Sequence, residues 1–133
     1  MGNYPYSSLD DMANLPYITR KLFWVASSKD DLSDFPKDVK LTFGVALRVV
    51  QNGQTPEIAA PLTQFGSGVY ELKEKHDGES YRAVYVVKLK RGVYVLDAFQ
   101  KKSKSGKAIP KEIKERIEGR LKCAKEKDEE VEK

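Results

Sequence analysis

Three basic residues in the second half of the chain have the types and spacing that phosphate chemistry needs. Arg82 lies inside an apolar, strand-like run, and Lys101 and Lys102 end a second such run. Arginine can clamp a phosphate with two hydrogen bonds, and lysine supplies a compact charge whose pKa falls when other cations crowd it. Such groups can cleave RNA without a metal, because the ribose 2′-hydroxyl is a built-in nucleophile that needs a base, charge stabilisation and a proton donor.

Strands are the elements that must position these side chains. The apolar pattern predicts strands over residues 69–75, 81–90 and 92–101. The Asp77-Gly78 pair is a strong hairpin signal between the first two strands, and a short turn joins the second to the third. We therefore expect the three strands to form an antiparallel meander.

Hairpin pairing predicts which basic residues meet. In the meander, the end of the third strand lies beside the start of the second, which lies beside the end of the first. We expect four cations to converge at this edge of the sheet, with His76 on the intervening turn: Lys73, Arg82, Lys101 and Lys102. The same basic segment supplies further candidates for RNA binding, namely Tyr81, Lys88, Lys104 and Lys107.

The net charge of +4 is concentrated in this segment. Residues 73–107 carry ten Lys and Arg against four Asp and Glu. Residues 1–72 carry six against eight, and residues 108–133 carry eight of each. A local positive field of this kind is typical of proteins with a phosphate-rich partner.

The other elements predict an α+β domain. Residues 21–26 have the pattern of a first strand, and two closely joined helices follow over residues 27–35 and 36–51. Residues 54–68 are predicted to form a loop, and Pro110 begins a last helix. The expected architecture is a helical hairpin packed on a small, mainly antiparallel four-stranded sheet, with a C-terminal helix.

Helical spacing identifies the faces that should be buried. The second helix has an apolar stripe along one face. The centre of the stripe is formed by Val39, Phe43, Leu47 and Val50, and Leu41, Val45 and Val49 widen it. The last helix has a stripe of Ile109, Ile113, Ile117 and Leu121. We expect an N-terminal extension over residues 1–20, one domain over residues 21–124 and a charged, frayed tail over residues 125–133.

Composition limits the classes of function. A chain of 133 residues suits one domain, and no apolar run approaches the roughly 18 residues that a membrane helix needs. The N-terminus lacks a signal-peptide pattern, so we expect a cytoplasmic protein. Cys123 is the only cysteine and His76 the only histidine, so neither an internal disulfide nor a zinc site is expected, and no cofactor is predicted.

Each candidate residue also has a purely structural interpretation. A lysine-rich loop after a strand is usually a solvated turn, and Arg82 can pair with Glu71 or Glu74 on the neighbouring strand. His76 can be an exposed turn residue, and Tyr81 can be a packing residue. From the residues alone, an RNA- or phosphate-binding α+β domain is the favoured interpretation.

Asp97 is unusual for its position in the third strand. Strict alternation places it on the same face as Val95 and Phe99, which are apolar. A carboxylate there requires either a place at the margin of the sheet or a cationic partner.

Several stretches in combination resemble the phage-derived branch of the RelE/HigB toxin superfamily. They are WVASSKDDLSDFP, the Gln-Asn-Gly end of the second helix, PLTQFGSGVYELKEKHDGESYRAVYVVKL, VYVLDAFQKKSKSG and IPKEIKERIEGRLK. The resemblance covers about residues 21–124. It implies a RelE-like fold, in which a helical hairpin lies against a small, mostly antiparallel sheet.

The resemblance also implies a function. Members of this superfamily are toxins of type II toxin–antitoxin systems that cleave mRNA without a metal, typically on the ribosome. The implied partners are mRNA, the ribosome and a cognate antitoxin, which in this branch is often a helix-turn-helix protein. No membrane is implied.

Position by position, the resemblance assigns roles to the basic residues. Arg82 matches the strand arginine that contacts the scissile phosphate, Lys101 and Lys102 match a Lys-Lys pair, and Lys73 falls where relatives often have arginine. At Asp97 relatives have histidine, and a carboxyl group donates a proton near neutral pH only if its pKa is raised. His76 or Tyr81 is then expected to replace the proton donor, or cleavage is expected to be weak.

Two other functions remain open from the sequence. Toxins of the ParE type share the fold but act on DNA gyrase, so the fold alone does not decide the target. A phage-derived RNA- or protein-binding module without toxicity is the third possibility.

Overall fold

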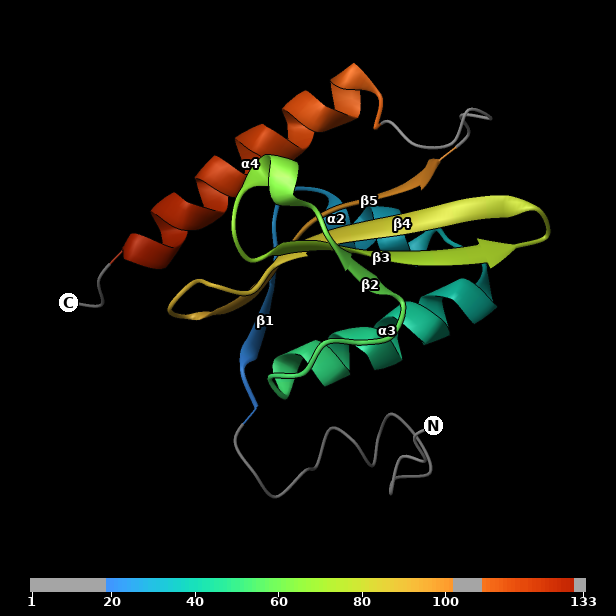
Figure 1. Ribbon diagram of the computed structural model, residues 1–133, viewed down its shortest axis with the longest axis horizontal. Coiled ribbons are helices and arrows are strands. Elements are labelled where there is room, and N and C mark those ends of the chain that lie inside the picture. The colour runs from blue at the N-terminus through green and yellow to red at the C-terminus, as the bar shows by residue number, and fades with distance from the viewer. Residues whose placement is uncertain (1–18, 102–108, 131–133) are drawn as a thin grey trace.

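The computed structural model describes residues 19–101 and 109–130 (Figure 1). In chain order these residues form β1 (Lys21–Trp24), α2 (Ser28–Ser33), α3 (Lys37–Gln51), β2 (Ala59–Pro61), the 3-10 helix η1 (Thr63–Phe65), β3 (Val69–His76), β4 (Glu79–Val86), β5 (Gly92–Lys101) and α4 (Lys111–Glu129). The predicted α+β class is confirmed. None of the helices in the described ranges is long and apolar enough to span a bilayer.

The sheet has five strands in the order β1-β5-β4-β3-β2. The meander of β3, β4 and β5 is antiparallel as predicted, whereas β1 pairs with β5 in parallel. The prediction of four strands is wrong, because part of the expected loop pairs with β3 as β2. A three-residue strand that ends in Pro61 gives no alternation signal, and proline is tolerated there because β2 is an edge strand.

The helices cover the two faces of the sheet in separate layers (Figure 1). The buried residues of α2 and α3 pack on Leu72, Ala83 and Val95, and α4 packs on the opposite face. The predicted centre of the α3 stripe is buried, but Leu41 on its flank is 52% exposed. The stripe is therefore narrower than predicted on that side.

One extra residue in β5 changes which side chains face α4. Pairing with β4 runs in register from Lys101 to Asp97, opposite Val84, and then moves by two residues so that Tyr85 pairs with Val95. The strand contains a β-bulge at Leu96. The prediction that Asp97 shares a face with Val95 is wrong, because the bulge turns Asp97 toward α4.

The β3–β4 hairpin closes through the predicted Asp77-Gly78 turn. Both residues have positive φ, 51° for Asp77 and 79° for Gly78, as a two-residue turn of type I′ requires. This turn fixes the register in which Lys73 lies opposite Arg82.

The C-terminal helix is longer than predicted and its end is anchored. α4 continues to Glu129, through residues expected to fray. Asp128 is buried, and its carboxylate accepts hydrogen bonds from the backbone N–H groups of Lys90 (2.8 Å) and Arg91 (2.7 Å) and from the Tyr94 hydroxyl (3.2 Å). Burial opposes ionisation, but these donors outweigh it, and the pKa of Asp128 lies below its ordinary value.

Candidate functional site

Three of the predicted cations meet on the α4 side of the sheet. Lys73 on β3 lies opposite Arg82 on β4, and Lys101 on β5 lies opposite Ser80, two residues from Arg82. The positive charges of Arg82 and Lys73 both act on Lys101. The predicted convergence of these three residues is therefore observed, while their roles in binding or catalysis stay predictions.

A buried carboxylate fixes the arginine of this cluster. Arg82 donates from Nη1 to Glu71 Oε1 at 2.9 Å and from Nε to Ser80 Oγ at 3.2 Å. Glu71 is only 7% exposed, so the pairing that a structural interpretation of Arg82 requires is present. Within the described part of the chain, Nη2 has no hydrogen-bond partner, so the fixed guanidinium can still offer this donor to a ligand.

Lys101 has the electrostatic environment of a lysine that can act as a base. Its side chain is buried, and burial lowers its pKa below the ordinary value. The charges of Arg82 and Lys73 lower the pKa further, and the charge of Glu71 opposes them. A lowered pKa raises the neutral fraction of the amine, which is the form that accepts a proton.

Asp97 is held by an arginine of α4. It is fully buried, its Oδ2 accepts from Arg116 Nε at 2.7 Å, and its Oδ1 accepts from Arg116 Nη2 at 2.8 Å. The backbone N–H of Ala98 also donates to Oδ1 at 2.9 Å. A cationic partner, one of the two predicted explanations for this carboxylate, is therefore present, and both oxygens face protein donors.

A second arginine of α4 extends this ion pair to α2. Arg120 Nη1 lies 3.6 Å from Asp97 Oδ1 and donates to the backbone oxygen of Leu96 at 3.0 Å. Its Nη2 donates to Ser27 Oγ at 3.0 Å, and Ser27 in turn donates to Asp31 at 2.8 Å. The bulge of β5 is thus bound to helices on both faces of the sheet.

The structure does not bring the two expected proton donors to this cluster. Tyr81 is buried on the α2–α3 face, and its ring packs edge-on against Phe35 with the centroids 5.0 Å apart. His76 lies beside the hairpin turn, 3.4 Å from Asp77, and alternation places it on the opposite face from Lys73. Packing of Tyr81, the structural alternative, is observed.

A family model described as Phage derived protein Gp49-like (DUF891) matches residues 30–122. The chain belongs to the Gp49-like family. No curated protein matches the sequence significantly. The matched span of this Gp49-like chain contains both the Arg82–Glu71 pair and the Asp97–Arg116 pair.

The other candidate residues of the Gp49-like chain lie apart from the cluster or outside the described residues. Lys88 lies two residues beyond the C-terminal end of β4, six residues after Arg82. Its Nζ donates to Ser67 Oγ at 2.9 Å. Lys102, Lys104 and Lys107 fall outside the residues that the structure describes. Their predicted roles stay predictions.

Sequence reasoning missed three members of the two ion-pair networks as site residues. The sequence predicts Glu71 only as a partner for Arg82, although alternation places it on the face of Lys73. Arg116 and Arg120 precede the buried Ile117 and Leu121 of the α4 stripe by one residue each. Their four-residue spacing was the available signal that they share a face of the Gp49-like helix.

Metal ligands do not gather in the described part of the Gp49-like chain. No group of three or more His, Cys, Asp or Glu side chains in residues 19–101 and 109–130 is placed to hold an ion. Cys123 is a free, half-buried thiol. The expectation that no cofactor is needed stays a prediction.

Proposed function

We propose that this chain is the RelE-like toxin of a type II toxin–antitoxin system and cleaves mRNA on the ribosome without a metal. The observation that carries the proposal is the buried Lys101 amine, with its lowered pKa, beside the Arg82 guanidinium that Glu71 fixes. Membership of the phage-derived Gp49-like family and the resemblance of the sequence to RelE and HigB toxins support it.

The proposed reaction uses the 2′-hydroxyl of the RNA as its nucleophile. Lys101 accepts the hydroxyl proton, the 2′-oxygen forms a bond to the adjacent phosphorus, and the bond from phosphorus to the 5′-oxygen breaks. Arg82 through Nη2 and Lys73 through its ammonium group stabilise the charge that develops on the phosphate oxygens. The products are a 2′,3′-cyclic phosphate and a 5′-hydroxyl.

The resemblance implies relatives with histidine at the position of Asp97, and this chain differs from them in how the leaving oxygen is protonated. Both Asp97 oxygens accept hydrogen bonds from protein groups, so we assign no proton transfer to it. In our proposal the leaving 5′-oxygen takes its proton from water. We therefore expect slow cleavage.

A cognate antitoxin is part of the proposal. A cationic surface attracts a partner of opposite charge, so we expect the antitoxin, of helix-turn-helix type, to cover the Lys73–Arg82–Lys101 cluster with acidic or apolar side chains. In this proposal the toxin, the antitoxin and the ribosome meet in the cytoplasm. The affinity of the two proteins should fall as the salt concentration rises.

The state of Asp97 favours a second candidate function. A chain that keeps the phosphate-binding cations but places a buried ion pair at the position of the histidine suits an RNA-binding module without cleavage. The two functions share the ligand and differ in the chemical step.

Induced expression in a bacterial host tests the proposal. Primer extension on a reporter mRNA would be compared for wild type, Arg82→Ala and the matched control Arg48→Ala, which removes a guanidinium on α3. We expect growth arrest with in-frame mRNA cuts in wild type and the control, and no cuts in Arg82→Ala. Arrest with intact mRNA would instead indicate a gyrase-directed toxin. Normal growth in all three strains would overturn the toxin proposal and favour the RNA-binding module without cleavage.

A further inference from the structure

A second concentration of positive charge lies at the end of β5 opposite Lys101. A hollow of about 380 Å³ is lined by Thr19, Arg20, Lys21, Lys90 and Arg91. Of the residues that the structure describes, one hydroxyl residue and four cations line it, and none of these lining residues is a carboxylate. We call it the β1–β5 hollow.

A close backbone approach builds this hollow. Lys21 pairs with Gly92 where β1 runs parallel to β5. A Cβ atom at Gly92 would lie 2.5 Å from the backbone oxygen of Lys21, so only glycine permits this approach. The approach brings the basic residues before β1 beside the basic turn before β5.

Arg20 is held rigidly at the hollow. Its backbone N–H donates to Gln51 O at 2.9 Å, and Gln51 Nε2 donates back to Arg20 O at 2.7 Å. Its Nη2 donates to the backbone oxygens of Leu89 (2.9 Å) and Gly92 (3.1 Å). A guanidinium fixed in this way loses little further entropy when it binds a ligand with its other donors.

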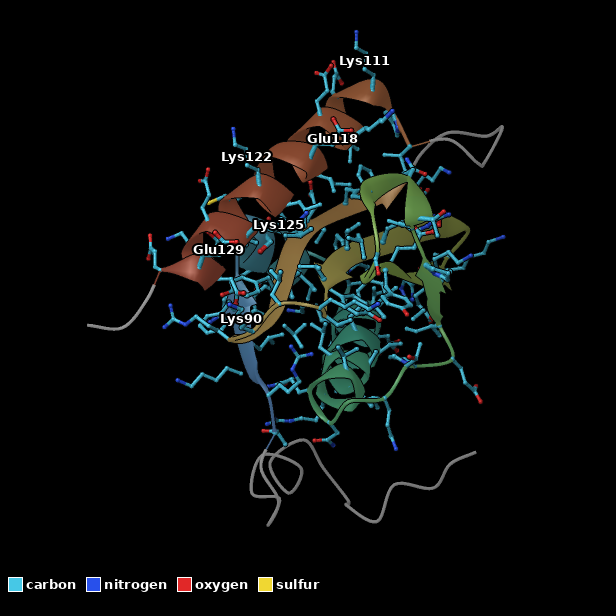
Figure 2. The ribbon with its side chains drawn as sticks, turned by 60° about the vertical axis from the view of Figure 1, so that its left-hand side comes forward. Lys90, Lys111, Glu118, Lys122, Lys125 and Glu129 are labelled. Carbon is cyan, nitrogen blue, oxygen red and sulfur yellow. The ribbon has the colours of Figure 1, made fainter. Side chains whose placement is uncertain are left out.

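The turn that carries Lys90 and Arg91 is fixed from the other side by α4. Both backbone N–H groups donate to Asp128, the carboxylate that also accepts from Tyr94. Figure 2 shows Lys90 on this turn, beside the C-terminal end of α4. Arg91 Nη1 reaches the Lys127 oxygen at 3.4 Å.

The acidic residues near the hollow leave its lysines available. Asp128 accepts hydrogen bonds from the backbone of Lys90 and Arg91, and its charge also interacts with the Lys90 ammonium group without a salt bridge. The exposed Glu129 and Glu130 lie at the end of α4. Among residues 19–101 and 109–130, Lys21 and Lys90 form no salt bridge. Both are exposed, so an anion can approach them from solvent.

We propose that the β1–β5 hollow binds backbone phosphates of the RNA at a point remote from the Arg82–Lys101 cluster. β5 joins the two sites, and its ten residues span about 30 Å at roughly 3.3 Å per residue. A polyanion can occupy two cationic sites at this separation, whereas one small anion cannot. The hollow contributes charge and no base-reading pocket, so its contacts are independent of sequence. This inference rests on the proposed RNA ligand.

A binding titration tests the hollow apart from the chemical step. The probe is a fluorescent 2′-O-methyl RNA oligonucleotide, which lacks the nucleophilic hydroxyl and is not cleaved. Lys21→Ala/Lys90→Ala in the full chain is compared with Lys40→Ala/Lys114→Ala, two exposed helical lysines whose loss changes the net charge equally. We expect the first pair to weaken binding about tenfold and to reduce the salt slope by about 1.4, the value for two phosphate contacts on a single strand.

The outcomes separate the hollow from the proposed function. Equal affinities of the two double variants would overturn the hollow as an RNA site. The RNA would also be challenged with inorganic phosphate at the same total concentration of phosphate groups. Displacement of the RNA would overturn the proposal, because the hollow would then be a site for a free anion. If the wild-type protein does not cleave mRNA, but Lys21→Ala/Lys90→Ala still weakens RNA binding more than the control pair does, only the proposed enzyme activity would be overturned.

Discussion

Arg116 clamps Asp97 with two parallel hydrogen bonds, Nε to Oδ2 at 2.7 Å and Nη2 to Oδ1 at 2.8 Å. Asp97 raises the pKa of Arg116 above its ordinary value through these hydrogen bonds, so the guanidinium stays charged. The pair joins α4 to the centre of the sheet, beside the bulge of β5. Asp97 thus serves to hold a helix in place.

Loss of this clamp should destabilise the fold. Asp97→Ala leaves Arg116 and Arg120 facing an apolar cavity, and we expect the free energy of unfolding to fall by about 2–3 kcal/mol. This is below the roughly 3–5 kcal/mol of a fully buried pair because the Arg116 side chain is 41% exposed. Urea denaturation would measure it, with the exposed Glu118→Gln of α4 as control. A change as small as that of the control would contradict the role of the clamp.

The pH dependence of cleavage should follow Lys101. Because burial and neighbouring cations lower its pKa, the neutral amine forms at a lower pH than in an exposed lysine. We expect the single-turnover rate to rise with pH and to level off above the pKa of Lys101, at a lower pH than the ordinary lysine value of 10.5 would give. Lys101→Gln should abolish this rise along with most of the activity. A Lys101→Gln variant with an unchanged profile would exclude Lys101 as the base.

The planar guanidinium geometry of Arg82 should contribute more to cleavage than its positive charge does. Arg82→Lys retains a cation but cannot donate to Glu71, Ser80 and a phosphate in one plane. We expect kcat to fall about 100-fold, as for the loss of one transition-state donor, with RNA affinity changed little. Single-turnover cleavage and binding of uncleavable RNA would measure the two effects. Equal losses in both would show that Arg82 only binds.

Acid should destabilise the chain partly through Asp128. Its pKa is lowered in the folded protein, so its contribution to stability is complete above the unfolded pKa near 3.8 and is lost as pH falls through the folded pKa. Asp128→Asn should cost about 1.5–3 kcal/mol at neutral pH, the range for hydrogen bonds to a charged group. Thermal melts should show the two proteins converging in acid. A difference that stays constant with pH would argue against the ionised carboxylate.

Local patterns predicted the cluster because its geometry depends on local signals. Asp77-Gly78 sets the turn, the turn sets the register, and the register places Lys73 opposite Arg82. The same reasoning failed at β2, which is too short for alternation to reveal. For Asp97 it predicted a cationic partner as one of two explanations, but it missed the face of the side chain and the identity of the partner. Neither a bulge nor a partner 19 residues further along the chain leaves a local pattern.

The bulge at Leu96 reverses which face of the sheet the odd-numbered side chains of β5 point to. Before it, the odd-numbered Val93 and Val95 face α3, whereas beyond it the odd-numbered Asp97 and Phe99 face α4. The strand can therefore begin as an ordinary core strand and still bring Lys101 to the side of Arg82. A β5 of the same sequence without the bulge would pair Leu96 with Val84, exchange the two faces downstream and put Gln100 in the place of Lys101, opposite Ser80. The bulge is therefore as much a determinant of this surface as the identity of its lysine.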